Sequence, residues 1–342
     1  MTKIDIISGF LGAGKTTFIK KLLQEAVSGE QVILIENEFG EIGIDGGFLK
    51  DSGVEIREMN SGCICCSLVG DFGQSLKEVL TTYHPDRIII EPSGVGKLSD
   101  VMKAVKDVAA EIQVTLNSAV TIVDAQKCKM YRKNFGEFFN NQIENAGTVV
   151  LSRTDIAPAD KVDLAVEIIR ELNPKAAVVT TPCDELTGKQ LLEIIEKPDT
   201  MEEDLLQELK EHHDHEEGSC GCGGHHHDHD HDHDHGEGCS CGHDHDHHHA
   251  DEVFTSWGVE NVSAMSKETL DRILDELAYG DGFGDVLRAK GMIPGIEKGT
   301  WLYFDLVPEQ YEIRDGIPEY TGKVCVIGAN LKEEELKLAF GK

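Results

Sequence analysis

The chain has 342 residues, 40% of them hydrophobic, and a formal net charge of -31. This length exceeds that of one ordinary domain, so we expect two domains and a linker. The acidic composition has no basic stripe, which excludes nucleic acid as the main partner, and apolar runs such as Val149–Leu151 are too short to cross a bilayer.

The N-terminal segment MTKIDIISGF has no charged-then-apolar signal pattern, so we expect a cytoplasmic protein whose first strand begins here. Over residues 1–200, short apolar β-rich runs alternate with amphipathic ones, which predicts a parallel α/β sheet with helices on both faces. The predicted strands are Ile4–Ser8, Val32–Ile35, Arg87–Ile90, Ala119–Val123, Thr148–Leu151 and Ala176–Thr180. The predicted helices are Thr16–Ala26, Gly73–Thr82 and Asp160–Leu172.

Residues 201–252 have a different composition, with 17 Asp or Glu and one lysine. Within them, residues 212–249 hold 15 of the 16 histidines, interleaved with Asp and with four cysteines. This composition lacks the apolar residues of a core and predicts a disordered, metal-binding linker. An expression tag is the alternative, but tags stand at termini and this segment is internal.

Residues 253–342 predict a small α+β domain. The predicted strands are Val253–Trp257, Val259–Val262, Gly299–Leu306 and Lys323–Gly328, and the predicted helices are Lys267–Tyr279 and Leu331–Phe340.

The segment Gly9–Thr16, GFLGAGKT, matches the phosphate-binding pattern G-x4-G-K-[ST] and stands between a predicted strand and a predicted helix. Glycines let the backbone N–H groups surround a phosphate, the lysine adds a positive charge, and the final hydroxyl is a ligand for Mg2+. The residues expected to contact the nucleotide here are Gly9, Gly12, Ala13, Gly14, Lys15, Thr16 and Thr17.

Guanine is the expected base, because Ser152-Arg153-Thr154-Asp155 follows a strand and resembles the guanine-reading pattern [NS]-K-x-D. Asp155 would accept two hydrogen bonds from the guanine ring, which adenine cannot supply. Arg153 replaces the usual lysine, and its stem can lie across the base. Alternatively, Asp155 caps the next helix and the protein uses ATP.

Two further strand ends carry carboxylates. Glu91 is followed by Pro-Ser-Gly94, where the carboxylate can hold a water of the Mg2+ shell and the Gly94 N–H can face the γ-phosphate. We therefore expect Lys15, Thr16, Glu91 and Gly94 to form the hydrolytic site. Asp124 either contributes to the Mg2+ shell or caps a turn.

Three of the ten cysteines, Cys63, Cys65 and Cys66, stand within four residues of a Gly-flanked turn. Thiols in this spacing can converge on one soft or borderline cation such as Zn2+. The segment 36–41, ENEFGE, follows the second strand, where its carboxylates could add oxygen ligands. A buried or redox-active thiol cluster is the alternative.

These motifs together resemble the metallochaperone branch of the CobW family of P-loop GTPases. The resemblance covers essentially the whole chain and implies a SIMIBI-type GTPase domain (1–200), the linker (201–252) and a CobW C-terminal domain (253–342). It also implies Cys63, Cys65, Cys66, Glu36 and Glu41 as ligands of the delivered metal, with the role of Glu38 open.

The implied function is slow GTP hydrolysis with Mg2+, coupled to delivery of a transition metal to a client protein. We expect neither nucleic acid nor a membrane as a partner. Zn2+ is favoured by the thiolates and histidines, with Co2+ and Ni2+ open, and a nucleotide-dependent homodimer is a further expectation. A regulatory or assembly GTPase for a metalloenzyme and a metal store are the alternatives.

Overall fold

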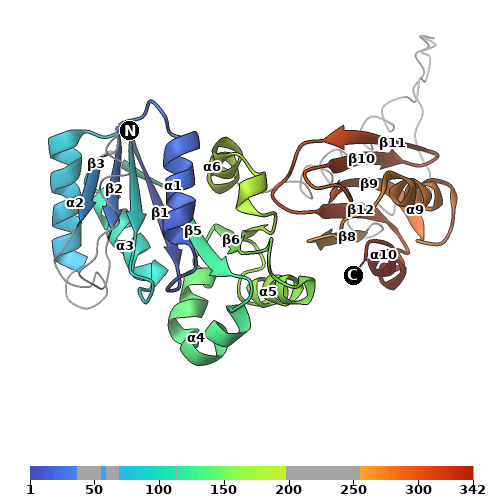
Figure 1. Ribbon diagram of the computed structural model, residues 1–342, viewed down its shortest axis with the longest axis horizontal. Coiled ribbons are helices and arrows are strands. Elements are labelled where there is room, and N and C mark those ends of the chain that lie inside the picture. Colours follow the sequence, from blue (N-terminus) through green and yellow to red (C-terminus); the bar gives the residue numbers. More distant parts are fainter. Residues whose placement is uncertain (37–54, 59–68, 113, 198–254, 342) are drawn as a thin grey trace, which may run out of the picture.

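The computed structural model describes residues 1–36, 55–58, 69–112, 114–197 and 255–341. Within these residues the chain forms a seven-stranded parallel sheet and a five-stranded antiparallel sheet (Figure 1). The predicted fold class, a P-loop type α/β sheet followed by a small α+β unit, is confirmed.

The parallel sheet has the strand order β3-β2-β4-β1-β5-β6-β7. Its strands are β1 (Thr2–Gly9), β2 (Val32–Glu36), β3 (Glu55–Glu58), β4 (Arg87–Glu91), β5 (Val114–Asp124), β6 (Thr148–Ser152) and β7 (Ala177–Val179). The central strands are buried almost throughout because apolar residues face both sides, as the continuous apolar runs predict.

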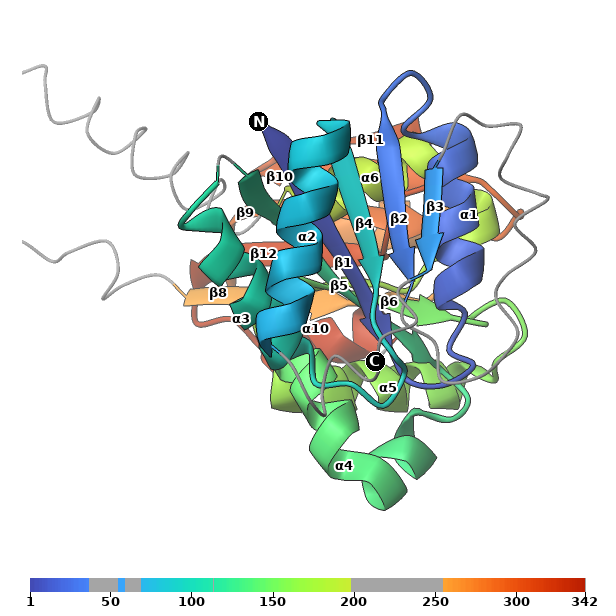
Figure 2. The same cartoon turned by 90° about the vertical axis from the view of Figure 1, so that its left-hand side faces the viewer.

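Helices cover both faces of this sheet, as expected (Figure 2). One face packs against α1 (Lys15–Glu25) and α6 (Gly188–Glu196). The other packs against α2 (Val69–Tyr83), α3 (Leu98–Ala109), α4 (Cys128–Glu144) and α5 (Ala159–Leu172). The sheet therefore presents the carboxyl ends of its strands, where ligands bind in open α/β folds, between two layers of helices.

Residues 255–341, here called the C-terminal unit, contain the antiparallel sheet in the order β11-β10-β9-β12-β8. Its elements are β8 (Thr255–Glu260), α9 (Lys267–Tyr279), β9 (Asp285–Pro294), β10 (Trp301–Val307), β11 (Gln310–Gly316), β12 (Lys323–Ala329) and α10 (Glu333–Ala339). The two helices bury leucines against the sheet, in a core that includes Phe304 and Phe340.

Several elements differ from the sequence prediction. Helices α3, α4 and α6 and strands β3, β9 and β11 were not predicted, and one strand, β8, replaces the two expected between residues 253 and 262. The predicted linker, 201–252, lies outside the described residues.

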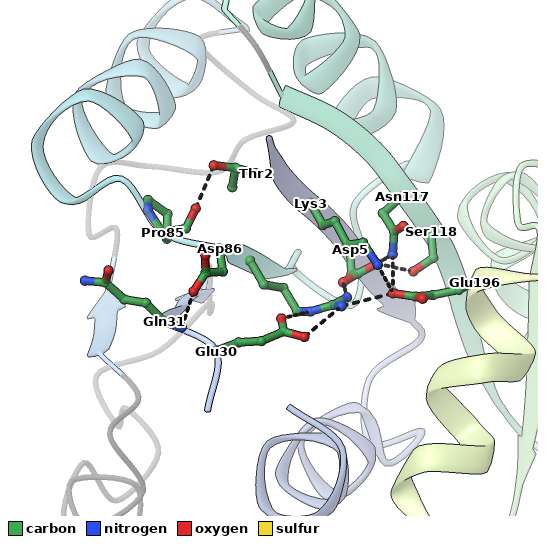
Figure 3. Close-up of polar contacts among 11 residues, drawn as sticks. Thr2, Lys3, Asp5, Glu30, Gln31, Pro85, Asp86, Asn117, Ser118 and Glu196 are labelled. Carbon is green, nitrogen blue, oxygen red and sulfur yellow. Dashed lines mark hydrogen bonds and ion pairs between the residues drawn. The ribbon is translucent and has the colours of Figure 1, made fainter. Parts of the chain in front are cut away.

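A buried polar network lies at the amino ends of the strands, opposite the phosphate loop (Figure 3). Arg87, 1% exposed, pairs with Asp5 and with Glu30 and Glu196 at 2.7 and 3.0 Å. Asp5 also accepts hydrogen bonds from Asn117 and Ser118, both at 2.7 Å. Because the last residue of α6 takes part, the network fixes the end of this helix against the sheet.

Candidate functional site

The phosphate loop connects β1 to α1 at the carboxyl edge of the parallel sheet. Gly12 and Gly14 have φ values of 68° and 102°, in the left-handed region that side chains rarely adopt. Gly14 is also the N-cap of α1, whose first turn contains no acidic residue. The N–H groups at the start of α1 therefore face the loop with no acidic side chain in their own turn, which suits a phosphate.

Lys15 and Glu91 meet beside this loop. The Lys15 Nζ lies 3.8 Å from the Glu91 Oε1, and their side chains are 9% and 14% exposed. Glu91 ends β4, which pairs directly with β1, so the sheet brings the carboxylate to the phosphate loop. Both residues were expected in the hydrolytic site, and the structure brings them together.

The segment after β4 approaches the phosphate loop closely. A Cβ on Gly94 would lie 2.8 Å from the Leu11 backbone nitrogen, so this approach requires glycine. The hydroxyls of Ser93, two residues after β4, and Ser8, near the end of β1, are buried and have no hydrogen-bond partner among the described residues. Buried hydroxyls without partners are costly, which indicates that a polar ligand completes this region.

Gln142, on α4, holds the segment 94–96 in place through two hydrogen bonds. This α4 side chain is fully buried, and its Nε2 donates to the carbonyls of Gly94 and Gly96 at 3.1 and 2.9 Å. Sequence reasoning missed Gln142, because a lone glutamine in a helix carries no signal of this contact.

A pocket of about 270 Å³ adjoins the phosphate loop. Of the residues expected to bind nucleotide, Ala13, Gly14, Thr17, Ser152, Arg153 and Asp155 line it. The lining residues that the sequence did not indicate include Phe18, Lys21, Ile156, Pro182, Cys183 and Asp184. Burial first, and then the charge of Asp184, raises the pKa of the Cys183 thiol to about 11, so this thiol is neutral at pH 7.

Arg153 lies across the edge of the phosphate loop. Its backbone has a φ of 61°, and its guanidinium donates to the Gly12 carbonyl at 3.0 Å and pairs with Asp124. The second Asp124 oxygen accepts the Gln126 N–H at 3.0 Å. Asp124 therefore caps a turn, one of its two expected roles, and positions Arg153. A contribution to the Mg2+ shell stays a prediction.

Of the expected metal ligands, Glu36 is described, and Cys63, Cys65, Cys66 and Glu41 lie outside the described residues, as does Glu38. Glu36 ends β2, is 8% exposed and pairs in register with Glu91 on β4. In the described part of the chain, no group of three or more His, Cys, Asp or Glu side chains could hold a metal ion. Nor does any helix in that part have the length and apolar character to span a membrane.

Comparison with known proteins identifies the family. The family described as CobW/HypB/UreG, nucleotide-binding domain, matches residues 3–180, more than half of the chain. Similar curated proteins include the zinc chaperone YeiR of Escherichia coli, 34% identical over 45% of this chain and 47% of that protein. The zinc chaperone CobW of a Sinorhizobium species is 35% identical over 45% of this chain and 51% of that protein.

The chain thus spans about half the length of these curated relatives. Among solved structures, the Zn(II)-bound YjiA GTPase of Escherichia coli aligns over 99% of this chain and 98% of its own, with 19% identity and a TM-score of 0.40. On the family match, together with the phosphate loop and its adjoining pocket, the chain belongs to the CobW/HypB/UreG family of nucleotide-binding proteins.

Proposed function

We propose that this protein is a cytoplasmic GTPase metallochaperone, which binds and hydrolyses GTP to load or release a transition metal, Zn2+ foremost, for a client protein. The main support for the proposal is that the nucleotide site and the start of the expected metal site lie next to each other. The phosphate loop, the pocket with Asp155 and the paired strand ends Glu36 and Glu91 share one edge of the parallel sheet. Membership of the family, and the names of the zinc chaperones similar to this chain, support it.

The pocket suits guanine because Asp155 lines it beside Arg153. A carboxylate at this place accepts from the ring N–H and the exocyclic amine of guanine, whereas adenine presents no such pair of donors. The pocket also has apolar walls, including Phe18 and Ile156, against which a base can pack.

The phosphates would lie over the N-terminus of α1, where Lys15 neutralises charge on the β- and γ-phosphates. The residues present fit Mg2+, because Thr16 and Glu91 supply hard oxygen donors and the Ser93 hydroxyl is buried without a partner in the described chain. Thr16 would hold the ion directly and Glu91 through a water. Mg2+ neutralises charge that develops on the transferred phosphoryl oxygens.

The metal cargo is linked to the nucleotide through neighbouring strand ends. Glu36 lies in register with Glu91, and Glu91 lies 3.8 Å from Lys15, so a change at the γ-phosphate acts close to the start of the segment that contains the three thiols. In the proposed cycle, Cys63, Cys65, Cys66 and carboxylates of Glu36 and Glu41 bind the metal when GTP is present. Hydrolysis then weakens this site.

The decisive experiment is a Zn2+ titration against a competing chelator with a non-hydrolysable GTP analogue, with GDP and without nucleotide. We expect different Zn2+ affinities in the three states, because coupling between two ligands is reciprocal. Lys15→Ala should abolish the difference, whereas Lys20→Ala, on the same helix, should preserve it. Equal affinity in all three states would refute the coupling and favour a metal store.

Base selectivity has its own test. Asp155→Asn should lose GTP and gain xanthosine triphosphate, because the asparagine amide donates to the 2-carbonyl that replaces the 2-amine. If ATP displaced a fluorescent GDP from the unaltered protein as well as GTP did, the proposed guanine selectivity would be wrong.

Deleting residues 212–249 should lower the number of bound Zn2+ ions and leave GDP affinity intact.

A further inference from the structure

One wall of the nucleotide pocket is built on a segment that the C-terminal unit touches. The segment 180–184 follows β7, the edge strand of the parallel sheet, and its residues Pro182, Cys183 and Asp184 line the pocket. Because β7 has a neighbour strand on one side only, the sheet itself supports this segment weakly.

Four hydrogen bonds attach the base of this segment to residues 319–321 of the C-terminal unit. The backbone N–H groups of Thr180 and Thr181 both donate to the Tyr320 carbonyl, at 2.8 and 3.0 Å. The Thr181 hydroxyl donates to the Glu319 carbonyl at 2.5 Å. The hydroxyls of Thr180 and Thr321 bond to each other at 2.8 Å.

Thr321 is also fixed within its own unit. It is fully buried, and its hydroxyl accepts the Asn261 N–H at 3.3 Å. Next to it, the Gly322 carbonyl accepts the Val262 N–H at 3.1 Å. Thr321 therefore links the pocket segment to the β8 end of the antiparallel sheet, where Glu260 and Asn261 contact α5.

Thr180 and Thr181 are 7% and 6% exposed, so their polar groups depend on these partners. If the C-terminal unit moved away, two backbone donors and two hydroxyls would lose their bonds together, and the segment would lose its fixed geometry. A pocket wall that is ordered in advance costs a ligand less to bind than one that it must order.

We propose that residues 319–321, Thr321 foremost, position the pocket wall 182–184, so that binding of the nucleotide base and docking of the C-terminal unit stabilise each other. The inference rests on the proposed function in that it places a guanine base in this pocket. It gives the C-terminal unit a role in nucleotide affinity, although no residue of that unit lines the pocket. Because coupling is reciprocal, GDP binding must tighten the docking as much as docking tightens GDP binding.

The test compares Thr321→Val with Thr321→Ser in the full chain. Valine keeps the shape of threonine and removes its hydroxyl, so we expect GDP affinity to fall about tenfold, while serine restores it to within about twofold. Affinity for inorganic triphosphate, which has no base, should stay unchanged in both variants.

Glu260→Gln is the matched control. It weakens another contact between the same two parts of the chain, where Glu260 accepts from Arg170 on α5 at 2.7 and 2.8 Å, away from the pocket segment. GDP affinity should change less than twofold, because this contact does not touch the pocket segment and such a partly exposed pair is weak. A loss equal to that of Thr321→Val would overturn the specific role of residues 319–321.

Hydrogen exchange in the unaltered protein gives a second readout that needs no variant. The amides of Thr180 and Thr181 should exchange more slowly with GDP than with triphosphate. Equal exchange, or GDP affinity of Thr321→Val within twofold of the unaltered protein, would overturn the inference. Failure of the unaltered protein to bind any guanine nucleotide would instead refute the proposed function, and this inference with it.

Discussion

Replacing Arg87 with methionine should destabilise the parallel-sheet part of the protein by about 3–5 kcal/mol, the usual cost of breaking a buried ion pair. The guanidinium is 1% exposed and binds three carboxylates, those of Asp5, Glu30 and Glu196 (Figure 3). Burial by itself lowers the pKa of Arg87, but the hydrogen bonds that Arg87 donates to Glu30 and the charge of Asp5 raise it overall. The arginine is therefore charged at every accessible pH.

The cost arises mainly at Asp5. Its side chain is 2% exposed, and after the substitution it keeps its bonds from Asn117 and Ser118 but loses its paired cation. The double variant Asp5→Asn with Arg87→Met removes that buried charge, so it should recover at least about 1 kcal/mol of the loss. Arg132→Met is the control, because its partner Glu171 is 65% exposed, and such a pair is worth less than about 1 kcal/mol.

The assay is urea unfolding at pH 7. Both tryptophans, Trp257 and Trp301, belong to the C-terminal unit, so tryptophan fluorescence reports the unfolding of that unit. Far-UV circular dichroism, which reports the secondary structure of the whole chain, is needed to detect unfolding of the parallel sheet and its helices. A loss below about 1 kcal/mol for Arg87→Met, or a double variant no more stable than the single one, would refute this reasoning.

Three further predictions concern other groups. Arg153→Met keeps the stem but removes the guanidinium that binds the Gly12 carbonyl and Asp124, so GDP affinity measured by calorimetry should fall about tenfold, and an unchanged affinity would exclude this role. Gln142→Leu frees the Gly94 segment, so GTP turnover should fall about tenfold while GDP affinity stays within about twofold; equal losses would indicate general unfolding. Burial raises the pKa of Glu196, but the hydrogen bonds drawn in Figure 3 outweigh burial and lower its pKa from the ordinary value of a glutamate. The stability it contributes is therefore fully present above that ordinary pKa and is lost as the pH falls through the lowered one. Glu196→Gln should flatten the fall of the urea midpoint under acid conditions; an unchanged slope would contradict this.

The local patterns of the sequence predicted much of the fold and the phosphate site. Gly9–Thr16 lies between β1 and α1 as expected, because its glycines and its place after an apolar run are properties of neighbouring residues. The alternation of apolar runs likewise predicted the parallel sheet. Strand β11 was missed because its residues alternate between exposed and half-buried and form no apolar run.

The three-dimensional structure decided which distant residues complete the site. Gln142 reaches Gly94 across 48 residues, and Thr321 reaches Thr180 across 141. No local spacing reports such contacts, because they depend on how helices and the second sheet pack. The sequence alone thus predicted a phosphate site at Gly9–Thr16, and the tertiary structure determined what shapes the pocket beside it, since buried polar groups find their partners only after packing.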